Sequence, residues 1–311
     1  AHPDRADRER EPVTNGATDV EPRHEWLTLS SGVELHTVHW DPADPPTPSS
    51  GDAVPVLLVH GLASNARLWD GVALHLARRG HRVVAVDQRG HGRSSKPDDG
   101  YDMATVANDL RLLVDELGWT RPAVAGHSWG GNVVLELAWS HPEAVSMIAC
   151  GDGGFIDLAG RFPEWDEAAD VLAPPRLAGT PLTDITRWIE TSAADWPEAG
   201  RQGTLANFEV RDDGTIAPWL SFDRHLTVLR GLWEHQPSTR YPEIHVPALL
   251  IGADTGDVAW SHSKHKAVDH ALAALPRGRA EWFSPAHHDV HAQHPDEVGD
   301  LLYQAIHDPN F

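Results

Sequence analysis

The stretch R-P-A-V-A-G-H-S-W-G-G, from Arg121 to Gly131, constrains the fold of this 311-residue chain more than any other. Its apolar residues 123–125 predict a short buried strand, and a G-x-S-x-G turn centred on Ser128 follows directly. Apolar residues then recur at helical spacing, at Val133, Val134, Leu137 and Ala138. This order predicts a strained strand-to-helix turn that lifts the serine Oγ clear of a sheet, because the flanking glycines let backbone pass closely. The alternative is an ordinary serine in a glycine-rich turn.

Apolar strands and amphipathic helices alternate on both sides of this turn. Continuous apolar runs predict buried strands at 54–60, 82–87, 145–150 and 246–252, with a further strand at 280–284. Helical spacing of apolar residues fills the gaps, and the last helix is predicted to begin near Pro295. The alternation predicts a doubly wound α/β fold, a mostly parallel sheet with helices on both faces. Ligands of such sheets bind at the carboxyl ends of the strands, where Ser128 is expected.

The start and the middle of the chain depart from this alternation. Residues 26–40 predict two strands joined at Ser31-Gly32, the second half-exposed because it alternates apolar and polar residues. Residues 1–24 are charged and contain proline, which predicts a disordered segment. Residues 155–241 hold many prolines and five of the thirteen tryptophans, and they predict an inserted, mostly helical cap. The core is then formed by 25–154 and 242–311.

Composition excludes several classes of partner. The formal net charge of −21 makes nucleic acid an unsuitable partner, since phosphate binding needs a basic surface. No run approaches the roughly 18 apolar residues of a membrane span, and the first residues lack the apolar core of a secretory signal. Cys150 is the single cysteine, so no internal disulfide can form. We therefore expect a cytoplasmic protein with a small-molecule substrate and no membrane or nucleic-acid partner. The composition leaves open whether the chain forms a homo-oligomer.

Several motifs in one order resemble the α/β-hydrolase superfamily. They are His60-Gly61 after a buried strand, D-Q-R-G-H-G-R-S at 87–94, the G-H-S-W-G-G turn and a late histidine. The resemblance covers nearly all of 54–152 and 246–307, and it implies an α/β-hydrolase fold with an inserted cap. Segment 87–94 is interpreted as a structural turn. A serine at the centre of the nucleophile elbow argues against haloalkane dehalogenase and epoxide hydrolase activity, since relatives of those types place aspartate there.

A serine nucleophile needs a base, and the histidines of P-A-H-H-D-V-H-A-Q-H-P are the candidates. In the family, the catalytic histidine precedes the proline of the final helix by seven residues, so Pro295 implies His288. His287 is the alternative, while His291 and His294 are expected to be solvated loop or helix-cap residues. The same stretch could bind a metal, but it lacks the H-E-x-x-H pattern, and a serine elbow needs no metal. We therefore predict neither a metal nor another cofactor.

The acid that orients the histidine has two possible positions. The family's chain order of serine, acid and histidine allows an acid after the strand at 246–252, where Asp254 and Asp257 lie. It also allows one after the strand at 145–150, where Asp152 stands between glycines. Thr255 occupies the position at which the usual G-x-x-D pattern has its aspartate, so Asp152 is the favoured acid and Asp257 or Asp254 the alternative.

Two further sets of residues are predicted around the nucleophile. The backbone N–H groups of Leu62 and Trp129 are the expected oxyanion hole, which stabilises charge that develops on the substrate. Trp188 and Trp219 of the cap, together with His60, are the predicted substrate contacts, because an indole offers an apolar wall and one donor.

These predictions describe a serine hydrolase that cleaves an ester or lactone through an acyl-enzyme. The acid after residue 151 and the tryptophan-rich cap resemble, among others, zearalenone-type lactone hydrolases, which implies a bulky or aromatic substrate. The acidic surface favours a neutral substrate over an anionic one. Alternatives in the same fold are hydrolysis of C–C bonds in diketone-like substrates, amide hydrolysis and perhydrolysis without a cofactor. A small-molecule sensor with little turnover is the alternative from another class.

Overall fold

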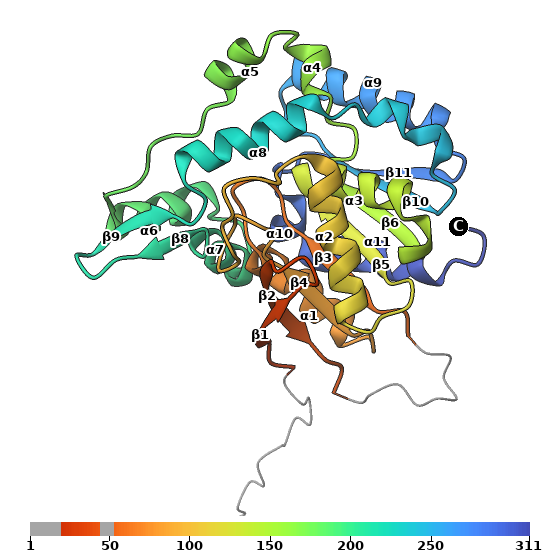
Figure 1. Cartoon of the computed structure of the whole chain (residues 1–311), viewed down its shortest axis with the longest axis horizontal. Coiled ribbons are helices and arrows are strands. Elements are labelled where there is room, and N and C mark those ends of the chain that lie inside the picture. The colour runs from red at the N-terminus through yellow and green to blue at the C-terminus, as the bar shows by residue number, and fades with distance from the viewer. Residues whose placement is uncertain (1–19, 44–52) are drawn as a thin grey trace, which may run out of the picture.

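The computed structural model describes residues 20–43 and 53–311, and its centre is an eight-stranded sheet of order β1-β2-β4-β3-β5-β6-β10-β11 (Figure 1). The strands are β1 Arg23–Thr28, β2 Glu34–Trp40, β3 Val56–Val59, β4 Val83–Val86, β5 Ala123–His127, β6 Met147–Gly151, β10 Ala248–Ala253 and β11 Gly278–Phe283. β1, β2 and β4 pair antiparallel, and every later pairing is parallel. The predicted doubly wound, mostly parallel sheet is confirmed.

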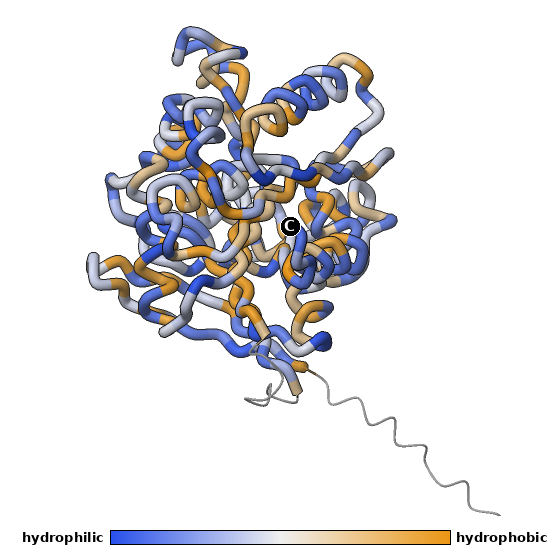
Figure 2. Tube along the Cα trace, turned by 90° about the vertical axis from the view of Figure 1, so that its right-hand side faces the viewer, coloured by the Kyte–Doolittle hydropathy of each residue, from blue (hydrophilic) through white to orange (hydrophobic). Residues whose placement is uncertain are grey.

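Helices cover both faces of the sheet. On one face pack α2 Met103–Glu116, α3 Trp129–Ser140 and α9 Val258–Ala274; on the other pack α1 Asp70–Ala77, α10 Val290–Gln293 and α11 Pro295–His307. Successive strand residues point to opposite faces, so Leu57 packs with the first group and Leu58 with the second. Both faces are therefore buried, which is why the parallel strands are continuous apolar runs. Figure 2 shows hydrophobic residues, coloured orange, in the interior of the molecule.

The first two strands differ from their prediction. β1 begins at Arg23, inside the segment expected to be disordered; residues 1–19 of that segment lie outside the described residues. β2 is buried along almost its whole length and is not half-exposed. Its polar side chains are paired: His36 Nδ1 lies 2.7 Å from Asp87 Oδ2, and Thr37 Oγ1 lies 2.8 Å from His39 Nε2. Paired polar groups tolerate burial, which an alternating pattern cannot reveal.

The turn at Asp87–Ser94 has the structural role that its motif indicates. The Asp87 carboxylate accepts hydrogen bonds from the backbone N–H groups of Ala66 at 2.7 Å and Arg93 at 2.9 Å. Burial alone would raise the pKa of Asp87, but the hydrogen bond with His36 and its charge lower it to about 2. A charged, fully bonded carboxylate therefore joins β2, β4 and η1 (Ala66–Trp69).

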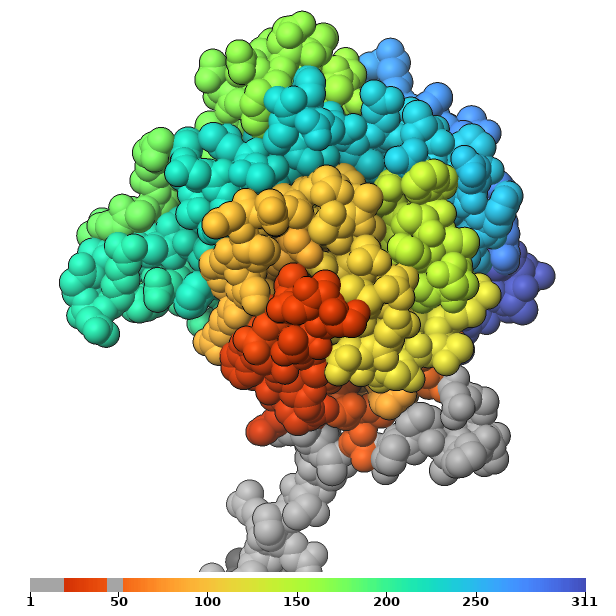
Figure 3. Space-filling model, in the orientation of Figure 1, coloured from red at the N-terminus to blue at the C-terminus, as the bar shows by residue number. Residues whose placement is uncertain are grey.

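Residues 155–241, called the insertion below, lie between β6 and β10 and contribute no strand to the main sheet. The helices of the insertion are α4 Leu158–Arg161, α5 Trp165–Leu172, α6 Leu182–Ser192, α7 Glu198–Leu205 and α8 Phe222–Glu234, with the short 3-10 helix η3 Pro237–Thr239. Of the other 3-10 helices, η2 Pro142–Ala144 follows α3, and η4 Tyr241–Glu243 begins at the last residue of the insertion. Figure 3 shows the insertion, green to cyan, over the upper and left parts of the molecule.

The insertion is mostly helical, as expected, but it also contains a small sheet. β7 Thr180–Pro181, β9 Thr215–Pro218 and β8 Phe208–Val210 form a separate three-stranded antiparallel sheet. Ile216 of β9 packs with Ile185 and Ile189 of α6 in a small apolar cluster of its own. Strands of two to four residues that depend on one such cluster leave too little periodicity in the sequence to be predicted. Within the described residues, no helix combines the length and the apolar character that crossing a membrane requires.

Candidate active site

Ser128 stands between β5 and α3 in a strained backbone conformation. Its φ of 53° and ψ of −121° lie outside the regions that residues with side chains prefer. The Ser128 N–H donates to Gly151 O at 2.8 Å, which ties the turn to β6. A Cβ at Gly126 would overlap the Gly130 carbonyl, and one at Gly130 would overlap the His60 carbonyl. Both glycines of G-x-S-x-G are thus required by close backbone contacts, and the serine itself is partly exposed.

Asp152 is the first residue after β6 and is also strained, with a φ of 42°. Its N–H donates to Ile251 O at 2.6 Å, and its Oδ1 accepts from the Ala253 N–H at 3.2 Å, so it is fixed against β10. Only 2% of Asp152 is exposed. Burial favours the neutral form, but the hydrogen bonds and charges of His288 and Lys264 outweigh it and lower the pKa of Asp152. Asp152 is therefore a buried carboxylate held in its charged form.

His288 lies on the loop between β11 and α10, against Asp152. Its Nδ1 is 2.6 Å from Asp152 Oδ2, and 44% of its side chain is exposed. His127 Nε2 donates to the His288 carbonyl at 2.9 Å, which holds the loop beside the residue preceding Ser128. Burial lowers the pKa of His288, but the Asp152 hydrogen bond and the charges of Asp289 and Asp152 raise it above its ordinary value of 6.5. The structure thus brings the predicted base and the favoured acid together.

The contact expected between His288 and Ser128 is not present as a hydrogen bond. Within residues 20–43 and 53–311, no hydrogen bond joins Ser128 Oγ to the His288 ring. Hydrogen bonds of this kind are often long without substrate and shorten only in the enzyme–substrate complex. The described contacts therefore connect His288 to the elbow through its carbonyl and His127.

The alternative acids have other partners. Asp254 Oδ2 lies 3.1 Å from His265 Nε2. Asp257 caps the N-terminus of α9, where its Oδ1 accepts from the Trp260 N–H at 2.9 Å. In the part of the chain that the structure describes, no hydrogen bond or ion pair joins either carboxylate to His288.

Lys264 is a close neighbour of Asp152 that the sequence did not predict. It lies on α9, and its Nζ donates to both carboxylate oxygens of Asp152, at 2.9 Å to Oδ1 and 2.6 Å to Oδ2. The buried residues of α9 are Lys264, Val268 and Ala271, at spacings of four and three. In the sequence, the burial of Lys264 could have been recognised because this lysine lies on the apolar face of the predicted helix.

The loop after β3 carries the predicted oxyanion residues. No hydrogen bond among the described residues involves the backbone N–H of Leu62, and Trp129 begins α3, where N–H groups have no intrahelical partner. A Cβ at Gly61 would lie 3.1 Å from Ser128 Cβ, so this loop passes directly beside the elbow. His60 is fully buried; its Nδ1 donates to Gly61 O at 2.7 Å, and its Nε2 accepts from the Gln88 N–H at 3.0 Å. His60 therefore fixes the loop, and its role as a substrate contact stays a prediction.

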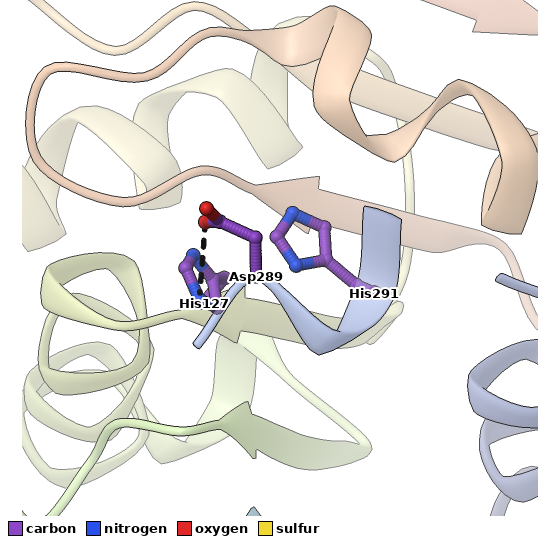
Figure 4. A group of neighbouring side chains, drawn as sticks. All are labelled: His127, Asp289 and His291. Atoms are coloured by element: carbon purple, nitrogen blue, oxygen red, sulfur yellow. Dashed lines mark ion pairs between the residues drawn. The ribbon is translucent and has the colours of Figure 1, made fainter. Parts of the chain in front are cut away.

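The side chains of His127, Asp289 and His291 form a cluster (Figure 4). His127 Nε2 lies 3.7 Å from Asp289 Oδ1, and the rings of His127 and His291 lie 4.3 Å apart. His291 was expected to be solvated, but it is 1% exposed and also packs on Trp69, with ring centroids 4.2 Å apart. Burial lowers the pKa of His127 to about 4 and that of His291 well below its ordinary value. Both imidazoles are therefore neutral near pH 7.

Neutral imidazoles and a carboxylate are possible metal ligands, and the donor atoms of the cluster lie within 4.8 Å of one another. His127 Nε2, however, already donates its proton to the His288 carbonyl at 2.9 Å. A cation at that nitrogen would displace the proton and the hydrogen bond. The absence of a metal stays a prediction, since His127 Nδ1 and both ring nitrogens of His291 are buried without a hydrogen-bond partner among the described residues. His287 is exposed, and its Nδ1 accepts from the Asp289 N–H at 3.1 Å; His294 occupies the N-cap position of α11.

A cavity of about 330 Å³ opens between the loop after β3 and the insertion. Ala63, the residue after Leu62, lines it together with Phe208, Phe222 and other apolar residues of the insertion. Arg176 and Arg211 line it as well, and neither forms an ion pair within the part of the chain that the structure describes.

The tryptophans chosen from the sequence do not line this cavity. The Trp188 side chain is exposed, at 56% of the residue. Trp219 lies under the Lys96 ammonium, whose Nζ is 5.4 Å from a Trp219 ring centroid. The apolar walls come instead from proline, phenylalanine and leucine residues of the insertion. The sequence shows that these tryptophans belong to the insertion, but it does not show which of them line the cavity.

Comparison with known proteins places these features in context. The family described as "alpha/beta hydrolase fold" matches residues 54–295. A soluble epoxide hydrolase of Corynebacterium sp. is 36% identical over 117 residues, 37% of this chain and 41% of that protein. A bifunctional esterase/perhydrolase of Acinetobacter calcoaceticus is 34% identical over 118 residues, 38% of this chain and 40% of that protein. The matched stretch thus spans about two fifths of the length of these relatives.

Solved structures resemble the chain over nearly its whole length. The structure of E-2-(acetamidomethylene)succinate hydrolase has a TM-score of 0.74 at 19% identity and covers 93% of this chain and 100% of that one. The enol-lactonase from Burkholderia xenovorans LB400 has a TM-score of 0.64 at 20% identity and covers 91% of this chain and 100% of that one. At these identities the likeness shows the fold alone.

Proposed function

Because the chain belongs to the α/β-hydrolase fold family, we propose that it is a serine hydrolase that cleaves a carboxylic ester or lactone through an acyl-enzyme. The observation that carries this proposal is the 2.6 Å contact between His288 Nδ1 and Asp152 Oδ2 at the sheet edge that presents Ser128. A serine hydroxyl needs a base to become a nucleophile, and an imidazole held by a buried carboxylate is such a base.

The proposed reaction assigns one step to each group. Ser128 Oγ attacks the substrate carbonyl while His288 Nε2 takes its proton, and Asp152 keeps the Nδ1 proton of His288 in place and stabilises the imidazolium. The oxyanion that forms is bound by the N–H groups of Leu62 and Trp129. His288 then protonates the leaving alcohol. In the second half of the reaction, water attacks the acyl carbonyl while His288 takes its proton, and His288 returns this proton to Ser128 Oγ as the carboxylic acid leaves.

The cavity beside Ala63 suggests the class of substrate, although neither Ser128 nor His288 lines it. Its phenylalanine and proline walls suit a bulky or aromatic group. The net charge of the chain favours a neutral substrate, whereas Arg176 and Arg211 at the cavity would attract a carboxylate. Comparing turnover of two substrates that differ only in one carboxylate would decide between a neutral and an anionic substrate. The likeness to an epoxide hydrolase does not change the proposed chemistry, since the elbow carries a serine hydroxyl and no carboxylate.

A fluorophosphonate probe tests the nucleophile. It should label Ser128 in the full chain, and Ser128→Ala should remove the labelling and lower turnover by about 10⁴-fold or more. Ser140→Ala, at the other end of the same helix, is the matched control and should keep both. Labelling that persists in Ser128→Ala would refute the proposal.

A substrate panel tests the reaction. It should contain an aryl ester with and without a carboxylate, a macrolactone and a diketone, with hydrogen peroxide added in parallel assays. Ester or lactone hydrolysis is the expected result. If only the diketone were consumed, C–C bond hydrolysis would take the place of ester or lactone hydrolysis as the proposed reaction. Formation of a peracid would favour the perhydrolase alternative. Binding of a panel member without turnover would favour a sensor.

A further inference from the structure

Lys264 is a buried cation whose hydrogen-bonding capacity is fully used. The residue is 8% exposed and is one of three lysines in the chain. An ammonium group has three N–H donors, and Lys264 has three acceptors. Two are the Asp152 oxygens, at 2.9 and 2.6 Å, and the third is the carbonyl of Ala253, the last residue of β10, at 2.5 Å. The lysine is thus fixed between the ends of β6 and β10.

One oxygen of Asp152 serves both the lysine and the histidine. Asp152 Oδ2 accepts from Lys264 Nζ at 2.6 Å and lies 2.6 Å from His288 Nδ1. The negative charge that would stabilise a protonated His288 is therefore partly neutralised by a cation two hydrogen bonds away. Opposite and like charges within about 4 to 6 Å commonly shift a pKa by 1 to 3 units, so this arrangement acts directly on the base.

Stability alone gives no clear reason for a lysine at this position. Taking an ammonium out of water costs several kcal/mol, and replacing a buried ion pair by apolar residues of similar volume is often neutral or stabilising. The neighbouring buried positions of α9 are Val268 and Ala271. An apolar residue would continue that face, so the charge at Lys264 calls for another explanation.

We propose that Lys264 is a positioning residue of the site, which holds the Asp152 carboxylate against His288 and makes His288 a weaker base than Asp152 alone would. This inference rests on the proposed function, in which His288 accepts the proton of Ser128. By weakening the base, Lys264 keeps more of His288 neutral, and so able to accept a proton, at moderately acidic pH.

The other groups around His288 determine the sign of the effect. Asp152 after β6 and Asp289 on its own loop raise its pKa, whereas Lys264 on α9 lowers it. His127 on β5 and His291 on α10 are neutral near pH 7 because burial lowers their own pKa values. Removing the Lys264 charge therefore leaves two carboxylates without an opposing cation. The pKa of His288 should rise, and the acid limb of the activity profile should move to higher pH.

The test measures the rate of fluorophosphonate labelling of Ser128 against pH in the full chain. In Lys264→Met the midpoint of the acid limb should rise by about one unit. Lys264→Gln should shift it in the same direction while its amide still donates to Asp152, which keeps the test valid if the methionine variant does not fold. Lys266→Met is the matched control, because Lys266 is exposed on the same helix, and its midpoint should stay at the wild-type value.

Two results overturn the inference. One is an unchanged midpoint in folded Lys264→Met or Lys264→Gln. The other is an equal shift in Lys264→Arg, which keeps the charge, because that would show a purely structural effect. Failure of the proposed function is distinguishable from both, since wild-type protein would then show no labelling of Ser128 at any pH.

Discussion

The carboxyl edge of the main sheet and the insertion hold their residues in different ways. At the edge, Ser128 and Asp152 are strained and fixed by backbone hydrogen bonds to the neighbouring strands, at 2.8 and 2.6 Å. In the insertion, large apolar side chains such as Val171, Trp188 and Val210 are exposed. The proposed catalytic residues are thus held by strand ends, and the surface of the insertion can change without moving them.

The largest expected effect removes the charge of the acid at the edge. Asp152→Asn should lower kcat by about 10⁴-fold, because asparagine favours the wrong tautomer of His288. Asp257→Asn is the control, since Asp257 only caps α9, and its kcat should stay near the wild-type value. Steady-state kinetics of both variants on one ester would show which aspartate is the acid that orients His288. Equal losses would contradict the assignment of Asp152 as the acid.

The next effect is the pH dependence of the wild-type enzyme. The pKa of His288 is raised above 6.5, and only the neutral ring can accept the Ser128 proton. Activity should therefore be lost as the pH falls through that raised value, and kcat/KM should decrease about tenfold for each further pH unit. A profile of kcat/KM against pH measures this directly. An acid-limb midpoint below 6.5 would contradict the electrostatics described for the edge.

A pair of variants in the insertion should give a smaller effect on binding. Phe222 lines the cavity and stacks on the Arg176 guanidinium, whose carbon is 3.7 Å from the ring centroid. Phe222→Ala should raise KM about tenfold, equivalent to roughly 1.4 kcal/mol. Trp188→Ala should change KM and kcat by less than about twofold, because its side chain is exposed away from the cavity lining. The reverse order would restore Trp188 as a substrate contact.

The smallest effect separates strain at the site from strain elsewhere. Arg121 has a φ of 51° at an exposed position before β5. Arg121→Gly should stabilise the fold by about 1 kcal/mol, because glycine adopts positive φ without a steric penalty. Denaturant unfolding measures the gain, and kcat should not change. A loss of stability would show that contacts of the Arg121 side chain outweigh the relief of strain.

The sequence predicted the edge better than the insertion, for a physical reason. Strands buried on both faces must be apolar throughout, so their positions, and that of Asp152 at a strand end, could be predicted. The contact of Asp152 with His288 is the geometry expected from the sequence, and its catalytic role stays a prediction. The burial of His291 and the pairing of Lys264 depend on residues distant in the chain, which no local pattern encodes.

A contact between Tyr241, the last residue of the insertion, and Gly154, the residue before the insertion, defines a unit for protein engineering. Tyr241 Oη donates to Gly154 O at 3.0 Å, and the Gly154 N–H donates to Asn132 Oδ1 at 2.8 Å. The chain therefore leaves and re-enters the sheet at one anchored point, two residues after Asp152. Segment 155–240 could be exchanged for that of a relative, or shuffled as a library, with both joints and the acid left in place. Exchange of this one segment could then change the substrate selectivity while the proposed catalytic residues stay unchanged.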